Sequence, residues 1–430
     1  MTVTIAHGAI QVPSGYEAEA LGQNFMGGFD YLPNGDIIGM YADPLFAENS
    51  ILGVIDANGD GIPAEFDKKY EFGIPVWAGF VKVSPGGGIV LFGESSTYKL
   101  YVLDLATYAV TELTPVSGSF DGAYDLAFVD DDHFFLSANP AYGTTNKVYR
   151  GDLSGNLQEV ISVASTYNSG IDVDDSGNLY FLKYGVVVPP PAGGCPLLRF
   201  AREDIDAVVQ GAPVLGEGDA TEIARLDGSF DVAWRSSGDF FVSDANNGKV
   251  YDVTSTGEVS DFATLAGDPY EGFRVLAIYR RDQSFNPGES TIAELAVDYL
   301  PLSSANPLDT YRITTTGAVP IRALVNSTIL PEGSQFIVTV VAQPTTTPFD
   351  GYVVLIGPGG TAYSLTPNGL TKGVAAYAKG VPGVGQEFKK RVLDLKVPGN
   401  VPAGVWTVYA GLMPEGTPPS PSKALALDSI

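Results

Sequence analysis

Cysteine and histidine are nearly absent from this chain of 430 residues, which holds one cysteine and two histidines. The single thiol, Cys195, excludes an intrachain disulfide framework and any metal site built from several thiolates. The histidines, His7 and His133, lie in sequence neighbourhoods that do not suggest a Ser-His-Asp triad. The sequence therefore offers no catalytic constellation, and we expect a function that rests on binding or structure.

Positive charge is also scarce, because 24 Lys and Arg stand against 50 Asp and Glu, a net charge of −26. Binding to nucleic acid or to an anionic membrane surface is disfavoured, since both require positive charge on the protein. No run reaches the roughly 18 apolar residues that span a bilayer. An acidic surface instead suits solubility and divalent cations.

The start of the chain, residues 1–7, lacks the basic and apolar regions of a secretory signal peptide. Either the protein is not exported by that route, or the signal precedes this numbering. The low lysine content, the many Thr, Ser and Gly residues and a calcium-type loop favour export. We therefore expect an extracellular or cell-surface location.

Glycine and proline are abundant, with 51 and 30 residues, and 45% of the chain is hydrophobic. This combination is typical of a globular all-β protein with many tight turns. A six-bladed β-propeller followed by an Ig-like β-sandwich is the architecture that the following patterns predict.

Six segments share one pattern: a turn of small residues, then an aromatic residue or Ile, then a short alternating strand. Their spacing, 43 to 59 residues, matches four-stranded propeller blades with a period of roughly 40–50 residues plus insertions. The anchors of the six segments are Phe29, Phe80, Tyr124, Ile171, Phe230 and Phe273. We expect a short helix at 202–210 within the fourth unit, and an N-terminal strand near 10–12 that completes the last blade.

The stretch 168–180, Asn-Ser-Gly-Ile-Asp-Val-Asp-Asp-Ser-Gly-Asn-Leu-Tyr, resembles the inner-strand signature of NHL-repeat and SMP-30/gluconolactonase-like propellers. The resemblance covers about residues 20–285 and implies the fold more than the function. Gluconolactonase-like enzymes hold a divalent metal at the channel through Glu, Asn and Asp. The resemblance implies that Asn168, Asp231 and either Glu17 or Glu19 correspond to those ligands.

The repeat pattern ends near residue 284, and we place a linker at 285–308 and a second all-β domain at 309–430. Short strand candidates in the second domain number six or seven over about 120 residues, as in a β-sandwich. The run 401–410, which contains Trp406, resembles the penultimate strand of bacterial Ig-like modules appended to secreted proteins. Such modules act as spacers or adhesion units.

The sharpest motif is the loop 56–67, Asp-Ala-Asn-Gly-Asp-Gly-Ile-Pro-Ala-Glu-Phe-Asp. Oxygen donors at positions 1, 3 and 5, a glycine at 6, a backbone carbonyl at 7 and a carboxylate at 12 suit Ca²⁺. The loop resembles those of dockerins and thrombospondin type-3 repeats, and an Asx-rich turn that binds nothing is the alternative. The predicted ligands are Asp56, Asn58, Asp60, the carbonyl of Ile62, and Asp67.

Alignment of the six anchors produces a second candidate site. The residue after each anchor is, in order, Asp30, Val81, Asp125, Asp172, Asp231 and Arg274. Four carboxylates and one guanidinium at equivalent positions would hold a cation or flank a ligand if they face the channel mouth. The alternative is that such Asp residues bond backbone amides of the adjacent blade and serve the fold alone.

Two functions remain open at this point. The first is a calcium-stabilised binding or structural protein that assembles with itself, with other surface proteins or with glycans. The second is a metal-dependent lactonase or esterase-like hydrolase at the channel mouth. The metal content separates them, since one calcium favours the loop alone and a second ion favours the channel.

Overall fold

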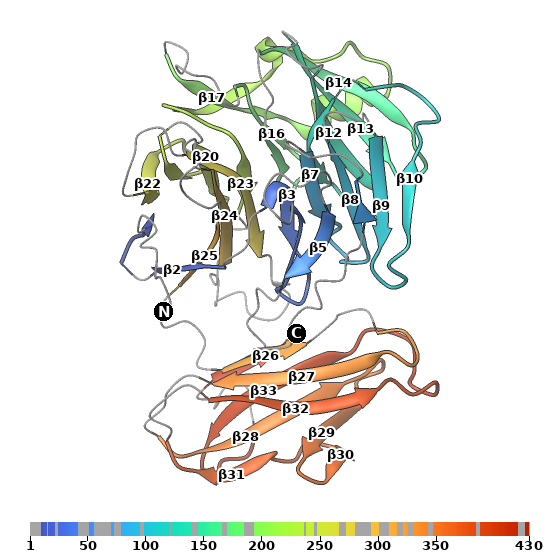
Figure 1. The fold of residues 1–430 in the computed structure, drawn as a ribbon, viewed down its shortest axis with the longest axis vertical. Coiled ribbons are helices and arrows are strands. Elements are labelled where there is room, and N and C mark those ends of the chain that lie inside the picture. The colour runs from blue at the N-terminus through green and yellow to red at the C-terminus, as the bar shows by residue number, and fades with distance from the viewer. Residues whose placement is uncertain are drawn as a thin grey trace, which may run out of the picture.

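The computed structural model describes most of the chain and is drawn in Figure 1. The described residues are 10–14, 16–21, 25–41, 51–55, 70–72, 79–94, 99–120, 122–139, 145–165, 170–184, 193–235, 238–244, 247–265, 272–279, 294–300, 309–315, 321–325, 330–342, 347–383, 388–419 and 426–429.

The described residues between 10 and 315 form six antiparallel sheets, and each is a propeller blade. Blade one contains β3 (Phe25–Tyr31), β4 (Ile37–Tyr41), β5 (Ile51–Ile55) and β6 (Tyr70–Glu71). Blade two contains β7 (Gly79–Val83), β8 (Ile89–Glu94), β9 (Lys99–Asp104) and β10 (Val110–Leu113). Blade three contains β11 (Ala123–Phe128), β12 (His133–Ala138), β13 (Thr145–Asp152) and β14 (Leu157–Ala164).

The remaining blades follow the same order from the inner strand outward. Blade four contains β15 (Ile171–Val173), β16 (Leu179–Leu182), β17 (Cys195–Phe200) and β18 (Thr221–Leu226). Blade five contains β19 (Val232–Trp234), β20 (Phe240–Asp244), β21 (Lys249–Val253), β22 (Val259–Leu265) and β1 (Ile10–Gln11). Blade six contains β23 (Gly272–Tyr279), β24 (Glu294–Leu300), β25 (Asp309–Thr315) and β2 (Tyr16–Ala20).

The inner strands close into a ring. Each inner strand contacts the next in the order β3, β7, β11, β15, β19 and β23, and β23 contacts β3. A closed ring of six sheets is the six-bladed propeller that the repeats predict.

Apolar clusters between consecutive blades explain the continuous apolar sequences of the second strands. In β12, Phe134 and Leu136 join a cluster with blade two, whereas Phe135 between them joins a cluster with blade four. Because successive side chains point to opposite faces, a strand buried on both faces is apolar at every position. The expected helix of the fourth unit is also present as α1 (Arg202–Val209), and a 3₁₀ turn, η1 (Glu217–Asp219), follows it.

The sequence placed the end of the propeller too early. The segment 285–308, predicted as linker, contains β24, and 309–315, predicted to begin the sandwich, forms β25 of blade six. The physical reason is burial, since Tyr311 and Ile313 of β25 pack with Phe241 and Phe262 of blade five. The propeller therefore extends from the N-terminal strands to residue 315 rather than ending at 284.

The N-terminal closure also differs from the prediction by one blade. β1 pairs with β22 as a fifth strand of blade five, whereas β2 pairs with β25 and completes blade six. The N-terminal segment thus supplies an outer strand to two consecutive blades, which ties the two ends of the propeller sequence together.

Two further sheets form the C-terminal region. One contains β26 (Ile321–Val325), β27 (Gln335–Ala342) and β32 (Phe388–Lys396). The other contains β30 (Gly369–Lys372), β29 (Ala362–Thr366), β28 (Phe349–Ile356), β33 (Thr407–Pro414) and β34 (Ala426–Ser429), with β31 (Ala378–Val381) paired to β28. Val338 and Val340 of the first sheet share one apolar core with Leu355 and Ala410 of the second. This is a β-sandwich, and its Ig-like character remains a prediction.

Within the described ranges, no helix has the length and apolar composition that crossing a membrane would require.

Candidate functional site

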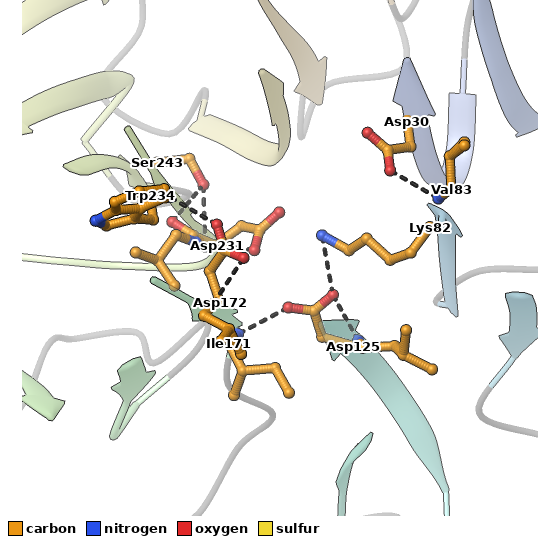
Figure 2. A network of polar contacts seen from close by, with 12 residues as sticks. Asp30, Lys82, Val83, Asp125, Ile171, Asp172, Asp231, Trp234 and Ser243 are labelled. Carbon is orange, nitrogen blue, oxygen red and sulfur yellow. Dashed lines mark hydrogen bonds and ion pairs between the residues drawn. The ribbon is translucent and has the colours of Figure 1, made fainter. Parts of the chain in front are cut away.

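Four aspartates and one lysine converge in the middle of the propeller, as Figure 2 shows. Asp30, Asp125, Asp172 and Asp231 come from blades one, three, four and five, and Lys82 comes from blade two. Asp125 and Asp231 are only 6% and 4% exposed, so this is a buried group of charges. We call these five residues the channel cluster.

The strand registers show that the four aspartates occupy two levels, which corrects the equivalent positions predicted from the anchors. Asp30 and Asp172 lie one residue before the last pair of their hairpins, Tyr31 with Ile37 and Val173 with Leu179. Asp125 lies three residues before its last pair, Phe128 with Phe134.

Asp231 likewise lies three residues before Trp234, which pairs with Phe240. In blade two the residue level with Asp30 and Asp172 is Lys82, one residue before Val83, and not Val81. The anchors misled the alignment because they lie at different distances from the hairpins: Phe29 is two residues before its last pair, and Tyr124 is four residues before its own.

Three of the aspartates hold the backbone of the following blade. The Val83 amide donates to Asp30 Oδ2 at 2.8 Å, the Ile171 amide to Asp125 Oδ2 at 2.7 Å, and the Trp234 amide to Asp172 Oδ2 at 2.6 Å. In each case the other carboxylate oxygen accepts from the amide of the next residue in its own strand, at 2.8 Å.

Asp231 also holds its own blade together. Its Oδ1 accepts from the Val232 amide at 2.8 Å, and its backbone N–H donates to Ser243 Oγ at 3.0 Å. Hydrogen bonds to ionised carboxylates are stronger than neutral ones. The aspartates of the cluster therefore act as connectors within and between blades, which is the alternative that the sequence left open.

Lys82 joins blades two and three by a charge contact, with 3.3 Å between its Nζ and Asp125 Oδ1. Burial alone lowers the pKa of Lys82, but the charges of Asp125, Asp231, Asp30 and Asp172 outweigh it and raise the pKa above its ordinary value. Burial raises the pKa of Asp125, and the opposing effects of Lys82 and the Ile171 amide are smaller. A lysine that stays protonated cannot serve as a general base or as a nucleophilic amine.

The close approach of the inner strands is visible at two glycines that stand three residues before the last hairpin pair. A Cβ at Gly28 would lie 2.5 Å from Phe80 Cα, and a Cβ at Gly170 would lie 2.7 Å from Asp231 Cα. Blades one and four therefore carry Gly at the level where blades three and five carry Asp.

Other predicted site residues lie outside the described residues or away from the cluster. The calcium loop 56–67, which joins β5 to β6, and Asn168 lie outside the described residues. Arg274 belongs to β23, but its side chain is not described. Glu17 and Glu19 lie on β2, the outermost strand of blade six, where Glu19 pairs with Arg312. They are therefore separated from the channel by three strands.

Among the residues that the structure describes, no group of three or more His, Cys, Asp or Glu side chains has a geometry that could hold a metal ion. The predicted calcium loop is not among those residues, so this finding does not bear on it.

Sequence reasoning missed Lys82 and Ser243. Lys82 precedes the hairpin turn at 84–88, and an alignment on hairpin turns instead of aromatic anchors would have placed it level with Asp30 and Asp172.

No family model matches the chain, and no curated protein matches its sequence. Among solved structures, it is similar to a calcium-binding regucalcin from Agrobacterium tumefaciens, with 13% identity, a TM-score of 0.46, and coverage of 68% of this chain and 92% of that one. It is also similar to a gluconolactonase from Xanthomonas campestris, with 12% identity, a TM-score of 0.45, and coverage of 71% and 91%.

A third similar structure is virginiamycin B lyase from Staphylococcus aureus, with 12% identity, a TM-score of 0.40, and coverage of 70% of this chain and 99% of that one. The first two belong to the group that the inner-strand signature resembles. The propeller assignment itself rests on the closed ring of sheets.

Proposed function

We propose that this protein is an exported binding or structural scaffold and that its channel cluster holds the propeller together rather than performing catalysis. One observation carries the proposal. Asp30, Asp125 and Asp172 each accept a hydrogen bond from a backbone amide of the next blade. Carboxylates engaged in this way are poorly placed to exchange protons with a substrate.

The propeller and the sandwich differ in net charge, and this difference supports assembly with other copies of the chain. Residues 316–430 carry eight Lys and Arg against six Asp and Glu, so residues 1–315 carry 16 against 44. A strongly acidic propeller and a slightly basic sandwich attract each other in a head-to-tail arrangement, which forms rings or filaments. Other surface proteins and glycans are the alternative partners.

The experiment for the assembly role is sedimentation velocity of the full chain at high concentration in low and high salt. We expect larger species in low salt that dissociate in high salt, because screening weakens contacts between exposed charges. A single monomeric species under both conditions would count against self-assembly.

Calcium belongs to this proposal as a structural ion. The loop 56–67 supplies Asp56, Asn58, Asp60, the Ile62 carbonyl and Asp67, which are the hard oxygen donors that Ca²⁺ takes. Its place between two strands of blade one suits an ion that fixes an insertion.

A second candidate is a metal-dependent lactonase or esterase-like hydrolase, and one observation favours it. Burial raises the pKa of Asp125, and a carboxyl group with a raised pKa inside a channel can serve as a general acid or base. Lactones are a suitable first substrate, since a gluconolactonase is among the similar structures.

The test is turnover of a panel of lactones and esters by the native protein with added divalent metals, beside Asp125→Asn and Asp231→Asn. If the scaffold proposal is right, the native protein shows no turnover that depends on Asp125 or Asp231. Turnover lost in both variants while they remain folded would instead establish the hydrolase.

A further inference from the structure

We propose that the Lys82 ammonium is a tethered cation that takes the place of a divalent metal among the four carboxylates of the channel cluster. The inference rests on the proposed scaffold role and identifies the group that balances the charge of the channel. The channel would then take no metal ion as long as Lys82 is present.

The position of Lys82 in the ring is the first step. Lys82 stands level with Asp30 and Asp172 in the strand registers, and its neighbour in the ring is Asp125, which stands level with Asp231. In Figure 2 the Lys82 side chain points toward Asp125 and Asp231. Its ammonium therefore reaches from the level of Asp30 and Asp172 to Asp125 on the other level.

Charge balance is the second step. Four carboxylates in one partly buried space repel each other, and buried charge without a counter-charge is costly. The Lys82 side chain is 18% exposed, and its Nζ lies 3.3 Å from Asp125 Oδ1. The raised pKa of Lys82, caused by all four aspartates acting against its burial, means that the ammonium persists through the physiological pH range.

The poor fit of a metal is the third step. The gluconolactonase-like resemblance implies a divalent ion on Glu, Asn and Asp, but Glu17 and Glu19 lie on the outermost strand of blade six. Asp231 already uses Oδ1 to accept the Val232 amide. A divalent ion among the carboxylates would also stand beside an ammonium of the same sign. With Lys82 in place, the described residues thus do not fit the metal that the family resemblance implies.

The experiment counts bound ions in the native protein, in Lys82→Met and in Lys99→Met. Lys99 is a matched control, because it belongs to the same blade and its Nζ lies 2.7 Å from Glu112 Oε2 at the exposed outer strands. Each protein is dialysed against Ca²⁺ or Mn²⁺, and the metal per chain is measured.

Removal of the ammonium leaves four carboxylates without a counter-charge, and we expect them to move together around a divalent ion. Lys82→Met should therefore bind one ion more than both the native protein and Lys99→Met. In the presence of chelator its melting temperature should fall by roughly 5 °C or more, and added metal should restore it. Equal ion counts and equal melting temperatures in the two variants would overturn the inference.

If Lys82→Met does not fold, Lys82→Ala refolded with Ca²⁺ or with ethylammonium replaces it. Recovery of folding with either cation, but not with tetramethylammonium, supports the tethered-cation role, and failure with both cations contradicts it. The inference would also be overturned if the native protein contains a bound metal ion and either Asp172→Asn or Asp231→Asn loses that ion.

Failure of the inference and failure of the scaffold proposal are distinguishable. Lactone turnover that survives chelation and is lost in Asp125→Asn would end the scaffold proposal and leave the tethered cation in place. A metal ion in the native channel without such turnover would end this inference alone.

Discussion

Lys82 and Asp125 join blades two and three inside the propeller, with 3.3 Å between Lys82 Nζ and Asp125 Oδ1. The same carboxylate accepts the Ile171 amide of blade four, so one aspartate connects three consecutive blades. Together with the contacts of Asp30 and Asp172, polar links cross four successive junctions between blades one and five. The channel cluster is therefore a continuous polar connection through five of the six blades.

Removal of one connector tests its contribution to stability. Asp172→Ala removes the acceptor of the Val173 and Trp234 amides, and we expect a loss of about 2–4 kcal/mol in the free energy of unfolding. Asp175→Ala is the matched control, since Asp175 is exposed in the adjacent hairpin turn. Denaturant unfolding measures both, and similar losses in the two variants would contradict the connector role.

The tight junction between blades one and two predicts a steric effect at a single glycine. Gly28→Ala places a Cβ 2.5 Å from Phe80 Cα, and we expect destabilisation by about 1–3 kcal/mol or more. Gly88→Ala in the hairpin of blade two has no heavy atom within 4 Å of the added Cβ and should be nearly neutral. The melting temperatures of the two variants test this prediction. If Gly28→Ala melts at the same temperature as the native protein, the inner strands are farther apart than this contact implies.

Tyr180 predicts a pH dependence of stability at alkaline pH. Burial, with the charge of Asp174 and the hydrogen bond from Tyr180 Oη to Asp174 Oδ2, raises the pKa of Tyr180 to about 12. The folded-state pKa exceeds the unfolded value near 10, so the protonated Tyr180 side chain stabilises the folded state. This stabilisation is complete below pH 10 and is lost as the pH rises through 12.

The measurement is the free energy of unfolding of the native protein and of Tyr180→Phe between pH 9 and 12. The difference in the free energy of unfolding between the native protein and Tyr180→Phe should become smaller as the pH rises across this interval. A difference that stays constant up to pH 12 would mean that Tyr180 ionises with the same pKa in the folded and unfolded states.

The propeller was predictable from the sequence, because its anchors and hairpins repeat and its second strands are mostly apolar. The two levels of aspartates were not predictable, since aromatic anchors such as Phe29 and Tyr124 stand at different distances from their hairpins. The boundary at 284 was wrong because the outer strands of blade six come from distant segments, β25 and β2. Such pairing is set by burial in three dimensions and leaves no local pattern.

The calcium loop predicts a dependence of stability on Ca²⁺. Added Ca²⁺ should raise the melting temperature of the native protein, because an ion that binds only the folded state stabilises it by about 2.7 kcal/mol at 100 times its dissociation constant. Asp56→Ala combined with Asp60→Ala should abolish the response, and Asp175→Ala should retain it. A response of the same size in all three proteins would place the ion elsewhere.

A double-mutant cycle on Lys82 and Asp125 tests the central claim most directly. The free energies of unfolding of the native protein, Lys82→Met, Asp125→Asn and the double variant yield the coupling energy between the two side chains. We predict a coupling of about 1–3 kcal/mol, with the double variant more stable than the sum of the single effects implies. Additivity within about 0.5 kcal/mol would contradict the account of a charge-linked propeller.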